Sequence, residues 1–442
     1  MGGNLRALRG AAGVRHGLLA VGIYILAGVA ALAHAQNIHQ TTSLSPQAQV
    51  GQKLFFDTNL SGSKRMSCAT CHDPNNHYAQ PTTNTRAVQL GGPKLTTPGF
   101  RAVPTLTYNE YTPPYSDNAP NPDGESKNSP GGGFTWDGRA DTQAQQATIP
   151  LLSPFEMANT SQAAVVAVVQ NASYAALFQQ AYGANVFSNS QTALTDIGLA
   201  LQAYQQEDLS FNSFTSKYDY VAAVQLSNGQ PVTLTAAELR GYLVFFRKDT
   251  GNCFACHYNG PISGGGGALF TDFTYENTGA PRNPNIPANA RKLGRSTYYD
   301  LGLCTAVNPN PVNAYVTPHV MPAGASLCGS FKTPTLRNTV TRNVYFHNGV
   351  FTSLAQVIDF YNTRDTNPAK WYPTVKEVVQ KFNDLPPDLK VYVDTMDAPF
   401  GQSPGETPHM TAENEADLLC FLETLTDGYV QGVTPQDPKC VN

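Results

Sequence analysis

Two short cysteine-histidine motifs constrain this chain more than any other feature. They read Cys68-Ala69-Thr70-Cys71-His72 and Cys253-Phe254-Ala255-Cys256-His257. Each motif places two thiols about one helical turn apart, with an imidazole directly after the second thiol. The thiols can bind the two vinyl groups of a haem while the histidine reaches the iron. The alternatives are a thioredoxin-like redox pair or half of a zinc site, and we expect two covalently bound haem c groups with His72 and His257 as iron ligands.

The first 35 residues have the composition of a secretory signal peptide. Three arginines and no acidic residue precede an apolar run over about residues 18–32, and Ala33-His34-Ala35 offers a cleavage site. We expect cleavage after Ala35 and a periplasmic protein; the alternative is an uncleaved anchor, for which the run is short. Without those three arginines, 25 of the 28 basic residues remain against 32 acidic ones, which argues against nucleic-acid binding.

The remaining four cysteines are Cys304, Cys328, Cys420 and Cys440. In an exported protein such an even set is expected to form disulfides, because free thiols do not persist in oxidising compartments. Proximity in the sequence favours the pairs Cys304–Cys328 and Cys420–Cys440 among the three connectivities that four cysteines allow. A zinc or cluster site is less consistent with the sequence, because none of the four has C-x-x-C spacing.

Apolar periodicity predicts a mainly α protein made of two cytochrome c-like haem domains with long irregular loops. The expected helices cover about 45–56, 161–182, 191–207, 236–248, 352–362, 373–382 and 411–427. Segments rich in Pro, Asn, Thr and Gly follow each haem motif and are typical of extended loops. The turn Ser227-Asn228-Gly229 separates the two units, so we place an N-terminal domain at 36–229 and a C-terminal domain at 230–442.

Five segments resemble, in the same order, the bacterial di-haem cytochrome c peroxidase family, which includes the methylamine-utilisation protein MauG. They are Gly51–Asp57 (GQKLFFD), Phe134–Arg139 (FTWDGR), Pro154–Met157 (PFEM), Phe331–Asn338 (FKTPTLRN) and Tyr345–Gly349 (YFHNG). They span nearly the whole mature chain, which is longer than the compact members mainly over 262–330. The resemblance implies that the haem of the first domain meets peroxide and that the second haem relays electrons to it.

By this resemblance, Trp136 lies between the two haems, Gln146 and Glu156 lie over the open face of the first iron, and Pro150 helps to keep that face dry. Splitting the O–O bond requires a group that moves a proton from the near oxygen to the leaving oxygen, and a pocket carboxylate can do so. We therefore expect Glu156 to be the acid-base group. From composition alone, Glu156 and Gln146 could be solvated helix residues and Trp136 a core residue.

The iron ligands decide the chemistry, because an iron with two protein ligands transfers electrons whereas an iron with one can bind peroxide. Many members of the family carry a histidine about sixteen residues after the first motif. This chain has Val88 there, so the first haem is expected to be open at rest. His77 lies close to the first motif and is interpreted as a surface or propionate-side residue.

For the second iron, many members use a methionine where this chain has Tyr361, as MauG-like proteins do. The residues Leu354, Val357, Ile358 and Tyr361 fall on one helical face, so the phenol is expected to point inward. A core tyrosine is the alternative, and His319 and Met321 are competing ligands. Tyrosinate ligation would lower the potential of the second haem and put simple cytochrome peroxidase behaviour in question.

The resemblance also implies one calcium ion between the domains. Asn109 would offer a side-chain oxygen, while Thr341 and Asn343 would offer backbone carbonyls, and such hard oxygen ligands suit calcium. Asn343 replaces a proline that is usual at this point, which a carbonyl ligand tolerates. We assign no chemistry to His347, the remaining histidine of the family segments.

Three functions are consistent with the sequence. The leading one is a peroxidase that reduces hydrogen peroxide with electrons from a small c-type cytochrome or cupredoxin. The second is a MauG-like oxidase that modifies a partner protein, which Tyr361 and Val88 favour. The third is an electron-transfer cytochrome without catalysis, in which both irons carry two protein ligands. The resemblance also admits a homodimer.

Overall fold

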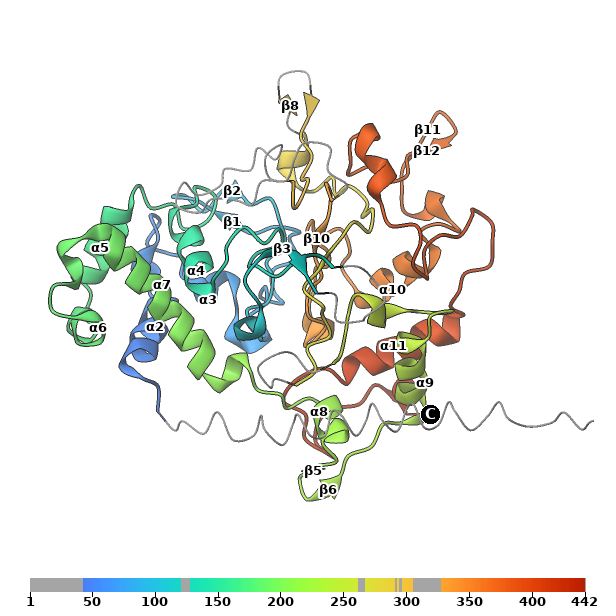
Figure 1. Cartoon of the computed structure of the whole chain (residues 1–442), viewed down its shortest axis with the longest axis horizontal. Coiled ribbons are helices and arrows are strands. Elements are labelled where there is room, and N and C mark those ends of the chain that lie inside the picture. Colours follow the sequence, from blue (N-terminus) through green and yellow to red (C-terminus); the bar gives the residue numbers. More distant parts are fainter. Residues whose placement is uncertain are drawn as a thin grey trace, which may run out of the picture.

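Helices dominate this protein, and its strands are all short (Figure 1). The computed structural model describes residues 43–120, 128–260, 267–290, 292–293, 296–304 and 327–441. The expected signal peptide at 1–35 lies outside the described residues, and so do His319 and Met321. The prediction of a helix-rich fold is confirmed. Within the described ranges, no helix is long and apolar enough to cross a membrane.

Most of the expected helices are present close to their predicted bounds. The helices are α2 (Pro46–Phe56), α3 (Cys68–Cys71), α4 (Gln143–Leu152), α5 (Gln162–Gln170), α6 (Ala175–Tyr182), α7 (Ser190–Glu207), α8 (Lys217–Ala222), α9 (Ala236–Phe246), α10 (Leu354–Thr363) and α11 (Ala412–Glu423). Helix α2 begins as predicted, because the Ser45 hydroxyl accepts the N–H of Ala48 and Pro46 occupies the first turn. Helices α4 and α8 were not among the predicted elements.

Two large hydrophobic clusters form the core. One is built from residues between 50 and 211, mainly of α2, α5 and α7, and the other from residues between 244 and 425, mainly of α9, α10 and α11. The first group of helices lies at the left of Figure 1 and the second at the right. Each haem motif is thus preceded by a helix of its own cluster, α2 before the first motif and α9 before the second. The boundary at residue 229 stays a prediction, since α8 lies before it but packs on the second cluster through Tyr218.

Close helix packing recurs in both clusters at a glycine. A Cβ atom on Gly51 of α2 would lie 1.9 Å from the carbonyl oxygen of Ala200 in α7. A Cβ atom on Gly241 of α9 would lie equally close to the carbonyl oxygen of Asp417 in α11. No side chain fits at either position, so each glycine lets the helix before a haem motif press against the backbone of a later helix.

The strands form six two-stranded antiparallel pairs rather than a larger sheet. They are β1 (Leu90–Gly91) with β2 (Thr97–Pro98), β3 (Ser116–Ala119) with β4 (Ser129–Gly131), β5 (Leu226–Ser227) with β6 (Gln230–Pro231), β7 (Tyr275–Glu276) with β10 (Phe331–Lys332), β8 (Lys292–Leu293) with β9 (Ser296–Thr297), and β11 (Thr374–Val375) with β12 (Val378–Val379). Long loops between the two helical groups carry most of them, as the Pro- and Gly-rich composition predicts.

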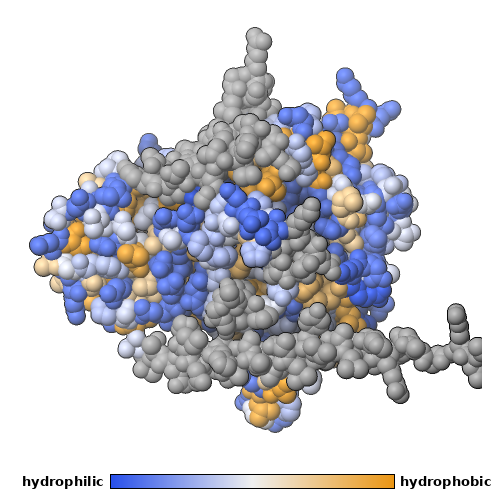
Figure 2. All heavy atoms as spheres, viewed as in Figure 1, coloured by the Kyte–Doolittle hydropathy of each residue, from blue (hydrophilic) through white to orange (hydrophobic). Residues whose placement is uncertain are grey.

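The helix predicted at 373–382 is wrong, because this segment folds as the hairpin β11–β12. Lys376 and Glu377 at its tip adopt left-handed backbone angles, which a helix excludes. Val375 and Val378 remain 53% and 60% exposed, and Figure 2 shows apolar surface at this hairpin. The valines that matched a helical spacing therefore do not face the core, and their β-branched side chains favour an extended backbone.

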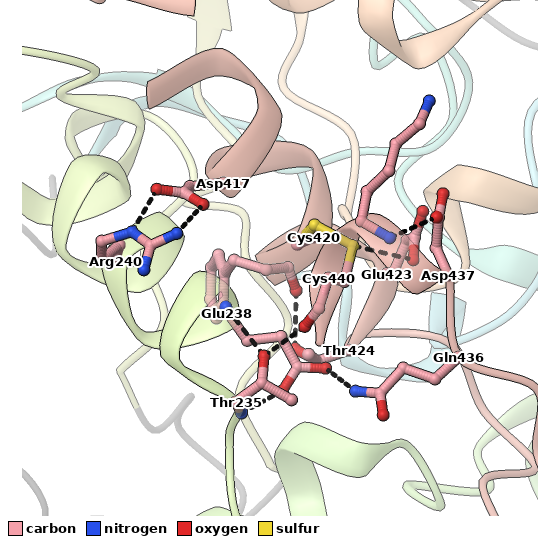
Figure 3. Close-up of a disulfide and its surroundings, with 12 residues drawn as sticks. Thr235, Glu238, Arg240, Asp417, Cys420, Glu423, Thr424, Gln436, Asp437 and Cys440 are labelled. Atoms are coloured by element: carbon pink, nitrogen blue, oxygen red, sulfur yellow. Dashed lines mark hydrogen bonds and ion pairs between the residues drawn. A yellow bond between two sulfur atoms is a disulfide. The ribbon is translucent and has the colours of Figure 1, made fainter. Parts of the chain in front are cut away.

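Both predicted disulfides are confirmed, Cys304–Cys328 and Cys420–Cys440. Figure 3 shows the second one, which joins α11 to the C-terminal segment beside the start of α9. There the Thr235 hydroxyl donates a hydrogen bond of 2.5 Å to the carbonyl oxygen of Cys440. The disulfide therefore holds the end of the chain over the N-terminus of the helix that leads into the second haem motif.

Candidate haem sites

The first haem motif lines a cavity of about 310 Å³ that also contains the residues expected around peroxide. Its walls include Cys71, His72, Trp136, Gln146, Pro150 and Glu156. The structure thus brings together, from segments far apart in the chain, the residues that the resemblance assigns to the first haem.

His72 is oriented for iron ligation. Its Nδ1 atom lies 3.0 Å from the carbonyl oxygen of Tyr78. Because a carbonyl can only accept, Nδ1 carries the proton and Nε2 is left as the ligand atom. Burial lowers the pKa of His72 to about 4, which keeps the imidazole neutral, as a metal ligand must be.

Helix α4 presents Gln146 and Pro150 to this cavity from one face, since they are four residues apart. Its N-terminus is fixed by a capping box between Thr142 and Gln145. Pro150 lies near the C-terminal end of the helix and removes one backbone donor there. This wall of the first cavity is therefore a helix that carries one amide side chain and one apolar ring.

Glu156 follows α4 in a turn that fixes its backbone. Its N–H donates to the carbonyl oxygen of Ser153 at 3.1 Å, and its own carbonyl accepts the N–H of Gly92 at 2.8 Å. Burial raises the pKa of the Glu156 carboxyl, an effect that the charge of Arg139 opposes in part. A carboxyl with a raised pKa accepts and releases protons at a higher pH than an exposed glutamate, which favours an acid-base role.

Trp136 lines both the first cavity and a second one, of about 210 Å³, that surrounds the second haem motif. Its indole N–H donates to the carbonyl oxygen of Ala102 at 2.8 Å, and its own carbonyl accepts the N–H of Lys332 at 2.9 Å. Trp136 is thus held between the two cavities, where the resemblance places it. Sequence reasoning gave no role to Lys332, which lines both cavities and whose pKa burial lowers to about 7.

Charged residues around Trp136 connect the two halves of the chain. Asp137, the next residue, pairs with Arg139 and with Arg101, whose Nη1 lies 2.9 Å from the carboxylate. Arg101 also binds Asp300 through two hydrogen bonds of 2.6 and 2.7 Å. Burial raises the pKa of Asp137, but the two guanidinium groups outweigh it and hold this pKa well below its usual value.

The second cavity repeats the ligand geometry of the first. It contains Cys253, Cys256, His257 and Tyr361. The Nδ1 atom of His257 lies 3.0 Å from the carbonyl oxygen of Phe270, and burial lowers the pKa of the ring to about 4. The ring of Tyr361 stacks between Phe346 and Phe400, at centroid distances of 5.9 and 5.3 Å.

The predicted apolar face of α10 is confirmed, since Leu354, Val357, Ile358 and Tyr361 all line the second cavity. Burial raises the pKa of the Tyr361 phenol. An iron at this position would favour the phenolate against that burial. The structure thus places Tyr361 on the wall of the second cavity, and its ligation of an iron stays a prediction.

Helices α4 and α10 occupy matching places in the two units. An isolated β-bridge precedes each of them, Phe134 with Ala140 and Tyr345 with Phe351, and each helix begins three residues after its bridge. Counted from the first residue, Pro150 is the eighth residue of α4 and Tyr361 is the eighth residue of α10. The residue that can ligate the second iron therefore corresponds to a residue with no ligand atom over the first.

Val88 lies outside the first cavity. It is buried in a small cluster with Ile286, Ala288 and Tyr298 of the C-terminal half, while its neighbours Gln89 and Leu90 line the cavity. This packing fixes the loop that could otherwise supply a ligand. His77 lines the first cavity and its pKa is lowered by burial, so it lies on the cavity wall rather than on the outer surface.

The calcium ligands stay a prediction. Asn109 lines the first cavity, and the side-chain amide of Asn343 donates to the carbonyl oxygens of Thr82 and Asn84 at 3.1 and 2.6 Å. Thr341 ends a short helical turn at 339–341. The backbone carbonyls of Thr341 and Asn343 therefore remain the groups to be tested as calcium ligands.

His347 is buried and stacks on Phe331 at a centroid distance of 3.5 Å. Its Nε2 atom lies 3.8 Å from the carboxylate of Asp384. These contacts fit a structural residue, in line with the absence of an assigned role.

The residues present fit two haem c groups. None of the four motif cysteines is in a disulfide, and Cys71 of the first motif and both cysteines of the second line cavities that are mostly apolar. Arg342 lines the first cavity and, within the described residues, forms no ion pair with a carboxylate; burial lowers its pKa to about 10. A buried cation of this kind suits a haem propionate. The fold and the two cavities define the class of the protein as a c-type cytochrome with two haem sites.

Comparison with known proteins agrees with this class. The family described as di-haem cytochrome c peroxidase matches residues 45–226. The chain is 33% identical to the methylamine utilization protein MauG of Paracoccus denitrificans, over 86% of this chain and 88% of that protein. It is 28% identical to the cytochrome-c peroxidase IdrP2 of Denitromonas iodatirespirans, over 77% and 82% of the two chains.

Among solved structures, the diheme peroxidase BthA of Burkholderia thailandensis superposes with a TM-score of 0.74 at 33% identity, covering 90% of both chains. A MauG-like protein associated with microbial copper homeostasis shares the fold at 23% identity, with a TM-score of 0.56. The chain belongs to the di-haem cytochrome c peroxidase and MauG family of oxidoreductases, and the resemblance predicted from its motifs is confirmed.

Proposed function

We propose that this protein is a periplasmic di-haem peroxidase that reduces hydrogen peroxide to water. One peroxide and two protons accept two electrons, which arrive singly from a small c-type cytochrome or cupredoxin, and two waters leave. The observation that carries the proposal is the difference between the matching helices α4 and α10. At the matching position Pro150 has no side-chain ligand atom, whereas Tyr361 has a hydroxyl; a haem in the first cavity would therefore gain no ligand from α4, and one in the second could gain Tyr361 from α10.

The protein side chains have separate tasks in this reaction. When bound, the first haem supplies an iron that binds peroxide and the second supplies a redox centre. Glu156 takes the proton from one peroxide oxygen and returns it to the other, which becomes water. Gln146 orients peroxide by hydrogen bonding, and Pro150 excludes water from the same face. Trp136 shortens the path of each electron between the two cavities that it lines.

Two measurements test this proposal. The resting ferric protein should show one high-spin and one low-spin iron by electron paramagnetic resonance. Added peroxide should then be consumed catalytically with reduced cytochrome c as donor. Two low-spin irons that ignore peroxide, even after partial reduction, would leave the electron-transfer cytochrome as the function.

A MauG-like oxidase that modifies a partner protein is the second candidate. Tyr361 and the buried, non-ligating Val88 favour it, and the named relative MauG shares 33% identity with this chain. Rapid reaction with peroxide without turnover of reduced cytochrome c would point to this function. Peroxidase turnover with the same donor would point to the first.

We also propose a periplasmic location, one bound calcium ion and a homodimer for this protein. The expected signal peptide supports the periplasm, and the two disulfides are typical of an oxidising compartment. The calcium ion would be bound by Asn109, Thr341 and Asn343, and two copies of the protein would form the homodimer. Metal analysis after chelation and sedimentation of the holoprotein test these two parts.

A further inference from the structure

Glu276 places a carboxyl group on the wall of the second cavity without a basic partner. It lies in β7, opposite Phe331 of β10. Its neighbour Tyr275 points into the protein, where the hydroxyl donates to the carbonyl oxygen of Gly132 at 2.5 Å. Successive side chains of a strand point to opposite faces, so Glu276 points into the cavity. Within the described residues, its carboxylate has no hydrogen bond or ion pair.

Two of the surrounding acids, Asp272 and Asp394, differ from Glu276 because they accept hydrogen bonds. Asp272 accepts hydrogen bonds from the N–H and hydroxyl of Thr274, and Asp394 accepts the N–H of Met396. Asp397 lines the same cavity. Burial, followed by the charges of Asp272, Asp394 and Asp397, raises the pKa of Glu276 to about 8. Glu276 therefore holds a proton at a higher pH than an ordinary glutamate.

Basic groups near this wall are engaged elsewhere. Lys332 donates to the carbonyl oxygen of Gly133, and His347 faces Asp384. The fully buried guanidinium of Arg364 pairs with Asp365 and donates to the carbonyl oxygen of Asp394.

Two further acids that line the cavity have basic partners of their own. Asp300 is paired with Arg101, and Asp384 is paired with Arg282. No cation among these groups neutralises Glu276.

We propose that Glu276 binds a proton when the second haem is reduced and releases it when that haem is oxidised. Reduction adds one electron from the external donor to the iron and removes one positive charge from the cavity. In a medium of low dielectric, an unpaired carboxylate then takes one proton from solvent. When the electron moves on, the proton leaves. Glu276 thereby lowers the charge that accumulates when electrons enter the protein.

The proposal rests on the second haem of the proposed function, but not on its peroxide chemistry. The test is a spectroelectrochemical titration of the low-spin haem between pH 6 and pH 9.5, without peroxide. In the wild-type protein, the potential should fall as pH rises above about 7, with a slope approaching one proton per electron near pH 8. In Glu276→Gln, that slope should be lost. Failure of the peroxidase function would show in turnover, not in this titration.

Glu423→Gln is the matched control, because burial also raises the pKa of Glu423, which does not line the second cavity. This variant should keep the wild-type slope. If Glu276→Gln fails to retain haem, Glu276→Asp keeps a carboxyl on a shorter arm and should keep the slope with a shifted midpoint. An unchanged slope in Glu276→Gln with an intact haem spectrum overturns the proposal, and so does a flat wild-type titration.

Discussion

At the scale of single residues, Glu156 should control the rate of peroxide reduction. Replacing it by Gln removes the group that moves the proton, so kcat/KM should fall by about 10²- to 10⁴-fold. Burial raises the pKa of Glu156, and the carboxylate is the active base. Wild-type activity should therefore be lost as pH falls through a value above the usual ~4.3 of glutamate. Steady-state assays over pH check this, with haem content as control. Unchanged turnover in Glu156→Gln excludes the role.

Tyr361 should control the spin state of the second iron. Tyr361 lines only the second cavity, so Tyr361→Phe should leave the spin state of the first iron unchanged. The second iron should change from low to high spin. Electron paramagnetic resonance of the resting protein measures both irons separately. Tyr372→Phe is the control, because Tyr372 is buried, does not line the second cavity and donates its hydroxyl to the carbonyl oxygen of Gly279. A low-spin second iron in Tyr361→Phe would assign its ligand elsewhere.

The sequence was informative where a residue type has few other uses. Paired cysteines followed by histidine identified both haem sites, and the spacing of Trp136, Gln146 and Glu156 placed all three at one cavity. It was uninformative for Lys332 and Glu276, whose significance depends on burial and on the charges that face them. Val88 indicated a missing ligand, but only the structure shows that it packs away from the cavity.

At the scale of elements, the disulfide Cys420–Cys440 should stabilise the second cluster. It closes a loop of 20 residues, for which restriction of the unfolded chain corresponds to about 3 kcal/mol. The double variant Cys420→Ser/Cys440→Ser should lose about this free energy of unfolding, measured by denaturant titration of the oxidised holoprotein. Haem content should stay at the wild-type level, because neither cysteine belongs to a haem motif. Equal unfolding midpoints would contradict a stabilising role.

Helix ends were predictable where local chemistry decides them, as at Ser45 and Pro46 of α2. The segment 373–382 was not, because Val375 and Val378 match a helical spacing while tertiary structure leaves them exposed. The match between α4 and α10 was also hidden. Their sequences share little, and the correspondence appears only when each helix is counted from the β-bridge that precedes it.

At the scale of the whole molecule, the two halves are joined around Trp136 by buried charges. Arg101 comes from the loop after the first haem motif, and Asp300 comes from the loop after the second. Their contact spans 199 residues of sequence, so no local pattern could have indicated it. The same pair connects the walls of the two cavities, since Arg101 lines the first and Asp300 the second.

Breaking this contact should therefore loosen the whole molecule. In Asp300→Asn, Arg101 keeps Asp137 at 2.9 Å, so the cost should be about 1–3 kcal/mol, below that of a fully unpaired buried charge. Burial raises the pKa of Asp300, but Arg101 outweighs it and lowers this pKa. A lowered pKa gives stability that is present above about pH 4 and is lost as pH falls through the folded value. The difference in the free energy of unfolding between wild type and Asp300→Asn, measured by denaturant titration, should thus be constant above pH 5 and shrink in acid.

Asp249→Asn is the control, because it removes an exposed partner of Arg247 and should leave the free energy of unfolding unchanged. A loss in Asp300→Asn that does not depend on pH would show that the carboxylate charge is not what joins the two halves.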